Sequence, residues 1–177
     1  MSENKSGPNP MHQIAISKIV INIGTQDDEQ KQLNAKRLLE VISQRKPTDA
    51  LAKKRLPEFK ITKGKKIGAF VTIRGEEAKP VLTRLINAAD RRIGPRAITN
   101  NSVSFGIHEY IDIQGIKYDP KIGMLGMNVN ITFERKGKRV ANRKIKAARI
   151  PKKHSIITKS EISEYLTKNF NVRSSEE

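Results

Sequence analysis

The 177-residue sequence contains no cysteine and no tryptophan, and aromatic residues make up only 5% of it. Without cysteine, disulfides, thiolate nucleophiles, Cys-ligated zinc sites and iron–sulfur clusters are excluded. No apolar run approaches the roughly 20 residues that a membrane-spanning helix needs. Residues 1–8 contain no apolar stretch typical of a signal peptide. We therefore expect a soluble intracellular protein whose length fits one domain, or one domain with an appendage.

Acidic residues are scarce in two segments, although the chain as a whole has 35 Lys or Arg and 18 Asp or Glu, a net charge of +17. Residues 51–75 contain eight basic residues and only Glu58, whereas residues 135–159 contain eleven basic residues and no acidic one. A solvated surface normally mixes both signs, and phosphates neutralise such stretches while releasing their counterions. We therefore expect a polyanionic partner. A membrane-surface helix is disfavoured because Gly137 and Pro151 interrupt the second segment, which lacks a bulky apolar stripe.

Hydrophobic periodicity predicts a short series of helices and strands. The first helix should run from a cap at Asp27 or Asp28 to about Arg45 and bury one face, formed by Ala35, Leu38, Leu39 and Ile42. A capping box of Thr158 and Glu161 predicts a last helix to about Phe170. Residues 48–58 lack a clear period and are expected to form a loop. The other expected elements are a helix over 77–91 and strands or extended segments over 12–23, 59–61, 67–73, 103–111 and 127–134.

This order of elements predicts an α+β fold, an antiparallel sheet with helices packed on one face. The arrangement is βαββαβ, RRM-like or split βαβ, with a basic C-terminal arm and a final helix. The expected division is a flexible N-terminus (1–11), an α+β RNA-binding domain (12–134), a basic arm and helix packed on the same domain (135–172), and a tail (173–177). A sheet with one free face beside basic loops is a common RNA-binding arrangement.

Catalytic signals are weak. His108, Glu109 and Asp112 could serve an RNA-modifying or nucleotide-processing enzyme, which is the alternative function, but their pattern is not that of a zinc peptidase. The sequence contains no Gly-x-x-x-x-Gly-Lys-Ser/Thr loop. We expect no catalytic residues, no metal and no cofactor. Because aromatic residues are few, we expect a preference for folded RNA held by shape and backbone contacts.

Several short motifs occur in order over about residues 8–172, and together they resemble one known family. They are Asn9-Pro10-Met11, Ile19-Val20-Ile21-Asn22-Ile23-Gly24, Phe59-Lys60-Ile61-x-Lys63-Gly64, Val71-Thr72-Ile73-Arg74-Gly75, Ser104-Phe105-Gly106-Ile107-x-Glu109 and Ile116-Lys117-Tyr118-Asp119-Pro120. The sequence is similar to the family of large-subunit ribosomal protein five, the ribosomal proteins that bind 5S rRNA. The basic arm and final helix resemble its archaeal and eukaryotic type.

The resemblance implies a structural, non-enzymatic constituent of the large subunit of the cytoplasmic ribosome. It implies that the protein helps attach 5S rRNA in the central protuberance. The other implied partners are 23S-type rRNA, P-site tRNA, neighbouring large-subunit proteins of the central protuberance and a small-subunit protein across the inter-subunit bridge. No membrane and no small-molecule substrate are expected.

The resemblance also implies site residues. The expected 5S rRNA contacts are Asn22, Gln44, Arg45, Phe59, Lys60, Lys63, Thr72 and Arg74, with the choice between Gln44 and Arg45 open. The 48–58 loop should reach P-site tRNA through Lys53, Lys54 and Arg55. Other rRNA contacts are expected at Arg135, Lys136, Lys138, Arg139, Arg143, Lys144, Lys146, Arg149, Lys152 and Lys153. Without the family, structural roles would be favoured for three of these residues: Asn22 as a turn cap, Thr72 as a strand former and Phe59 in the core.

Overall fold

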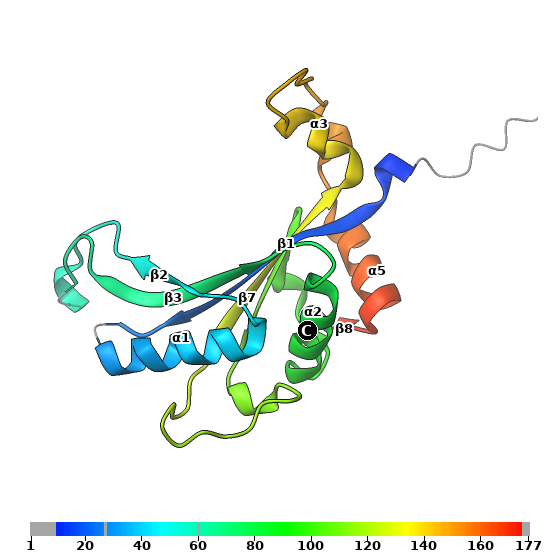
Figure 1. The fold of residues 1–177 in the computed structure, drawn as a ribbon. Helices are drawn as coiled ribbons and strands as arrows, with labels where there is room; N and C mark the ends of the chain where they lie inside the picture. The colour runs from blue at the N-terminus through cyan, green and yellow to red at the C-terminus, as the bar shows by residue number, and fades with distance from the viewer. Residues whose placement is uncertain (1–9, 27, 60, 175–177) are drawn as a thin grey trace, which may run out of the picture.

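A computed structural model describes residues 10–26, 28–59 and 61–174, except the side chains at positions 153 and 174 (Figure 1). Its strands are β1 (Ile14–Gly24), β2 (Thr48–Leu51), β3 (Lys66–Ile73), β4 (Arg92–Ile93), β5 (Ile98–Thr99), β6 (Ser102–Ile107), β7 (Met127–Arg135) and β8 (Arg173–Ser174). Its α-helices are α1 (Glu29–Ser43), α2 (Ala78–Ala88), α3 (Arg139–Asn142), α4 (Lys152–Ser155) and α5 (Lys159–Phe170). The predicted α+β class is confirmed.

The main sheet has six strands in the order β2-β3-β1-β7-β6-β5, and every pairing in it is antiparallel. Alternate residues of its strands enter the core, as the period of two requires. The buried set of β1 and β3 is Ile19, Ile21, Ile23, Ala69, Val71 and Ile73. These residues share one core cluster with the predicted buried face of α1 (Ala35, Leu38, Leu39 and Ile42) and with the apolar stripe of α2.

The capping residues predicted from the sequence mark the starts of two helices correctly. The Asp28 carboxylate accepts hydrogen bonds from the backbone N–H groups of Gln30 and Lys31, which α1 itself cannot satisfy. The predicted capping box of Thr158 and Glu161 is present at the start of α5. Position 27, the alternative cap of α1, lies outside the described residues.

The expected 48–58 loop is wrong at its start, because Thr48–Leu51 forms β2 and pairs with β3. The expected strand at 59–61 is also wrong. Pro57–Phe59 form a 3-10 helix, and Ile61 makes only an isolated bridge to Leu56; Lys60 lies outside the described residues. Proline favours a helix start, since its fixed φ suits the first turn. β2 was not predicted because its four residues are too few to show a periodic pattern, and they form a strand only through their pairing with β3.

The expected extended segment 103–111 is too long. β6 ends at Ile107, and Tyr110–Asp112 form a 3-10 helix in which Tyr110 is fully buried. The Tyr110 hydroxyl accepts a hydrogen bond of 3.1 Å from the Asp119 backbone N–H, which turns the chain inward here. At the start of the expected tail, β8 pairs in parallel with β4. Of the expected flexible N-terminus, residues 1–9 lie outside the described residues and Pro10–His12 form a 3-10 helix.

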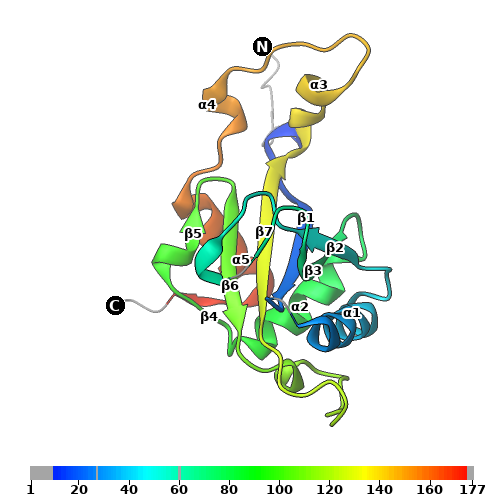
Figure 2. The same cartoon turned by 90° about the vertical axis from the view of Figure 1, so that its left-hand side faces the viewer.

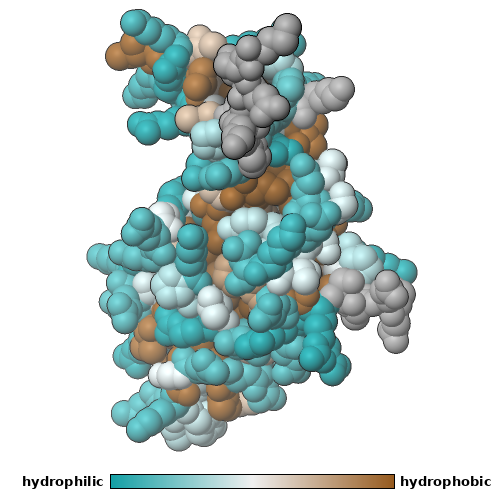
Figure 3. All heavy atoms as spheres, turned by 90° about the vertical axis from the view of Figure 1, so that its right-hand side faces the viewer, coloured by the Kyte–Doolittle hydropathy of each residue, from teal (hydrophilic) through white to brown (hydrophobic). Residues whose placement is uncertain are grey.

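Within the part of the chain that the structure describes, one side of the main sheet carries no α-helix. In Figure 1, α1 and α2 lie below the strands, while the hairpin of β2 and β3 extends to the left and the arm with α3 rises at the top. Figure 2 shows the strands running towards this arm, with α5 behind them. Figure 3 shows the arm as a mostly hydrophilic projection, with hydrophobic residues gathered at the neck beneath it. We call the uncovered side of the sheet the open face. The basic hairpin extends from the β2 edge of the sheet, and the basic arm continues from the end of β7.

Candidate nucleic-acid interface

Asn22 and Thr72 lie side by side on the open face. Asn22 pairs with Phe70 across β1 and β3, and Val20 pairs with Thr72, so Asn22 and Thr72 are diagonal cross-strand neighbours. Both side chains point away from the core, because the residues on either side of each are buried. The pairing of β1 with β3 thus brings together two residues that are 50 positions apart.

A hollow of about 340 Å³ lies beside Asn22 on this face. Its lining from the open face includes Val20, Ala50, Gly68, Phe70 and Asn130. The Asn22 Oδ1 atom is buried and has no hydrogen-bond partner among the described residues. Because this oxygen accepts no hydrogen bond there, Asn22 does not act as the turn cap expected from a purely structural role. A buried acceptor without a partner also costs free energy in the unbound protein.

The floor of the hollow depends on a glycine. Gly24 of β1 pairs with Gly68 of β3, and a Cβ atom at Gly68 would overlap the Ile23 carbonyl oxygen. A Cβ atom at Gly24 would meet nothing within 4 Å. The absence of a side chain at Gly68 thus lets the two strands approach closely and keeps this part of the face bare.

Phe59 does not join Asn22 and Thr72. It lies in the 3-10 helix at the far end of the β2–β3 hairpin, and 58% of its surface is exposed, so it is not a core residue either. Lys63 lies in the turn that follows, and Arg74 is an exposed residue just after β3. Phe59 and Lys63 of the expected 5S rRNA set thus lie on the hairpin, apart from Asn22 and Thr72 on the open face.

The basic residues Lys53, Lys54 and Arg55 are exposed within the same hairpin, directly after β2. The base of the hairpin is fixed to α1 through Asp49. Its carboxylate lies 2.5 Å from Lys36 Nζ and 3.5 Å from Lys66 Nζ, and it accepts a hydrogen bond of 3.1 Å from Gln32 Nε2. The hydrogen bond from Lys36 is the largest cause that lowers the pKa of Asp49 below its ordinary value.

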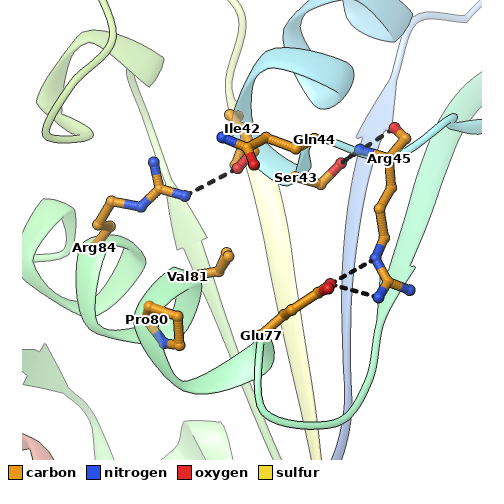
Figure 4. Close-up of a pocket in the computed structure, with 8 residues that line it drawn as sticks. All are labelled: Ile42, Ser43, Gln44, Arg45, Glu77, Pro80, Val81 and Arg84. Atoms are coloured by element: carbon orange, nitrogen blue, oxygen red, sulfur yellow. Dashed lines mark hydrogen bonds and ion pairs between the residues drawn. The ribbon is translucent and has the colours of Figure 1, made fainter.

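Gln44 and Arg45 lie beyond the C-terminal end of α1, on the helical side of the molecule. They line a cavity of about 560 Å³ with the first turns of α2 (Figure 4). Both residues are exposed, but the Arg45 guanidinium donates two hydrogen bonds, of 2.5 and 3.1 Å, to the Glu77 carboxylate. No residue lines both this cavity and the hollow beside Asn22. The structure therefore leaves Gln44 freer than Arg45 for an RNA contact.

Arg135, one of the expected rRNA contacts, has its guanidinium bonded within the protein. Its guanidinium donates to the His12 carbonyl oxygen at 2.8 Å and to the Glu161 carboxylate at 2.8 Å. After the Thr158 backbone N–H, Arg135 is the next partner that lowers the pKa of Glu161. Arg135 thus joins the N-terminal 3-10 helix, the end of β7 and the start of α5.

Two neighbouring lysines also have protein partners. Lys136 Nζ donates to Gln13 Oε1 at 2.8 Å, and Lys138 Nζ pairs with Glu134 at 3.0 Å. The chain returns to the domain at Ile157, whose backbone N–H donates to Asn101 Oδ1 at 2.7 Å. The arm is therefore fastened at both ends.

Between these ends the arm is largely exposed. It contains the short helices α3 and α4, and the Ala148 backbone N–H donates to the Val140 carbonyl oxygen at 3.3 Å. Its expected rRNA contacts are exposed at Arg139, Arg143, Lys144, Lys146, Arg149 and Lys152. Position 153 lies in α4, and its side chain is outside the description. No acidic residue occurs between 135 and 159 to neutralise these charges.

The alternative catalytic residues form no recognisable centre. His108 and Glu109 are exposed after β6, and Asp112 ends a 3-10 helix. Among the described residues, no group of three or more His, Cys, Asp or Glu side chains could hold a metal ion. The search for membrane spans, restricted to the described residues, found no helix long and apolar enough to cross a bilayer.

Asn130 is the residue of this face that the sequence did not single out. The alternation of β7 showed that it belongs to a wet face, but not that this face lies beside Asn22. Val20 pairs with Asn130 on one side and with Thr72 on the other. The alternation of residues in β7 therefore predicted that Asn130 faces solvent, but only the strand order places it near Asn22.

Comparison with known proteins agrees with these observations. Residues 9–62 match the family model described as "Ribosomal protein L5", and residues 66–163 match the model of the C-terminus of the same ribosomal protein family. Similar curated proteins are named "Large ribosomal subunit protein uL5". Those of Sulfurisphaera tokodaii and Methanobrevibacter smithii are 41% and 39% identical over 93% of this chain and 93% and 96% of their own lengths. The protein from Nitrosopumilus maritimus is 41% identical over 92% of this chain and 94% of its own length.

These matches cover both the sheet and the arm, and they contradict the alternative of an RNA-modifying enzyme. The chain belongs to the ribosomal protein L5 family, whose members are structural, non-enzymatic proteins of the large subunit of the cytoplasmic ribosome.

Proposed function

We propose that the chain binds 5S rRNA through the open face and helps attach it to the large subunit in the central protuberance. One observation carries this proposal: Asn22 and Thr72 lie together on the uncovered side of the sheet, between segments of net charge +7 and +11. Short polar side chains on a rigid sheet can recognise ribose and base edges, whereas long cations at its borders attract phosphates of any sequence.

The two basic segments receive different partners in this proposal. The arm, exposed between Arg139 and Lys152, contacts 23S-type rRNA, because its charges have little within the protein to neutralise them. The hairpin carries Lys53, Lys54 and Arg55 away from the sheet, where they meet phosphates of P-site tRNA. Asp49 supports this role, since it holds the base of the hairpin against α1. The family resemblance adds a small-subunit protein at the inter-subunit bridge and neighbouring large-subunit proteins.

Binding of 5S rRNA by the purified full chain tests the proposal. Filter-binding titrations at several salt concentrations should show a dissociation constant lower for 5S rRNA than for a double-stranded RNA of equal length. Thr72→Val removes one hydroxyl and keeps a β-branched side chain, and it should weaken 5S rRNA binding by about tenfold. Thr83→Val is the matched control on α2, where the hydroxyl only donates to the Lys79 carbonyl oxygen. Equal affinity for both RNAs, or equal effects of both variants, would contradict the proposal.

A further inference from the structure

We propose that the hollow on the open face receives one unstacked base of the bound RNA, an adenine or a cytosine, and that Asn130 reads it together with Asn22. The inference rests on the proposed 5S rRNA binding. It adds the chemical group of the RNA that is recognised and a residue that recognises it.

The absence of charge in the hollow selects a base over a phosphate. Among the described residues that line it, none is charged, although the chain carries a net charge of +17. A phosphate would be placed against cations, which the hairpin and the arm supply elsewhere. The neutral part of a nucleotide is its base, and an uncharged hollow between two basic segments suits it.

The shape of the hollow suits a flat apolar ring. Val20 and Ala50 supply small aliphatic side chains, and the buried Gly68 adds no side chain to the lining. The half-buried Phe70 ring lies in the same lining and offers an aromatic contact. At about 340 Å³ the hollow is at the small end of ligand pockets, which hold about 300–1,000 Å³. It therefore holds one base, in keeping with a chain too poor in aromatic residues to stack a row of them.

The polar groups of the hollow select the edge of the base. Asn22 Oδ1 is buried without a partner among the described residues, but Asn22 itself lines the hollow, so a turn of its amide towards the bound base would bring this acceptor to a donor. An exocyclic amino group supplies that donor, and in adenine and cytosine a ring-nitrogen acceptor lies next to it. Asn130, half-buried at the other side of Val20, brings a second amide with its own donor and acceptor. Amides recognise adenine in DNA by this pairing of donor with acceptor, and an unstacked RNA base presents the same pair on its Watson–Crick edge, at adenine N6 and N1 or cytosine N4 and N3.

Chemical probing of the complex of the full chain with 5S rRNA tests the inference. Dimethyl sulfate methylates adenine N1 and cytosine N3 only when that edge is free, so the wild-type protein should protect one such base in an unpaired region. Asn130→Ala should restore the reactivity of this base and weaken binding by about tenfold. Asn169→Ala is the matched control, because Asn169 is an exposed asparagine of α5 that does not line the hollow.

A second variant keeps the test independent of the amides. Ala50→Leu fills the hollow while Asn22 and Asn130 remain, and it should abolish the protection in the same way. Thermal unfolding of each variant establishes that it is folded. The inference is overturned if the wild-type protein protects no adenine or cytosine, if Asn169→Ala acts like Asn130→Ala, or if Ala50→Leu protects like the wild type. If the wild-type protein does not bind 5S rRNA, the proposed function fails as well; if it binds and only these variants are silent, the proposed function stands.

Discussion

Replacing Asn22 by alanine should weaken RNA binding without weakening the fold. In the unbound protein the Asn22 Oδ1 atom is buried and has no partner among the described residues, and leaving such a group unpaired costs about 1–3 kcal/mol. Asn22→Ala removes this cost together with some side-chain packing. We therefore expect the free energy of unfolding to stay within about 1 kcal/mol of the wild type or to rise. For a chain of this length that corresponds to a melting temperature within about 4 °C of the wild type, or higher.

The same substitution removes an acceptor that the RNA satisfies in the complex. Loss of that buried hydrogen bond costs about 1–3 kcal/mol, which is about 5–150-fold in the dissociation constant for 5S rRNA. Because no charge is removed, the slope of affinity against salt concentration should not change. Calorimetric unfolding and filter binding across salt concentrations measure both effects, with Asn169→Ala, at an exposed position of α5, as the control. A large loss of stability with unchanged affinity would refute the reasoning and assign Asn22 a structural role.

Four further results are expected. Replacing Lys53, Lys54 and Arg55 together by alanine should leave the 5S rRNA dissociation constant within about threefold, while tRNA protection at the P site of reassembled ribosomes falls; a large loss of 5S rRNA binding would show that the two surfaces are wrongly assigned. Gly68→Ala should destabilise the fold by about 1–3 kcal/mol in urea unfolding, because its Cβ would overlap the Ile23 carbonyl oxygen, whereas Gly24→Ala, across the same pair, should cost less. Asp49→Asn should lower stability at pH 7. Because the folded-state pKa of Asp49 lies below its ordinary value of 3.8, this stabilisation is complete above about pH 4 to 5 and is lost as the pH falls through and below 3.8, so urea titrations at pH 7 and pH 3 should show the difference shrinking. Backbone amides of residues 138–153 should exchange rapidly in the free protein and become protected with rRNA, because like charges oppose ordering; slow exchange in the free protein would contradict this.

The parts of the fold that the sequence predicted correctly depend on neighbours along the chain. The buried face of α1 follows from spacing, and the start of α5 follows from Thr158 and Glu161, three residues apart. β2 escaped prediction because its four residues owe their strand conformation to pairing with β3. The sequence predicts a short strand over 59–61, whereas in the structure Pro57 starts a 3-10 helix that includes Phe59.

The candidate site was predictable in its residue types and not in its geometry. The distribution of charge along the sequence indicates both basic segments, but it does not distinguish Arg135, which is bonded within the protein, from the other ten basic residues of 135–159. The partners of Arg135, His12 and Glu161, lie 123 and 26 residues away, which composition does not show. Asn22 and Thr72 came from the resemblance, and only the pairing of β1 with β3 makes them neighbours. Asn130 needed the pairing of β1 with β7 as well.

The fastening of the arm at Arg135 and Ile157 makes it a closed loop in place of a loose tail. Since the two ends are already held, RNA that captures the arm does not have to pay the entropy of loop closure and orders only its interior. The loop can also be cut without loss of the last helix, because Ile162 and Leu166 of α5 are buried in the common core. A protease cleaving between residues 143 and 150 should therefore leave two fragments that remain one particle. The basic arm is in this sense an insertion between β7 and α5, two elements of the same core.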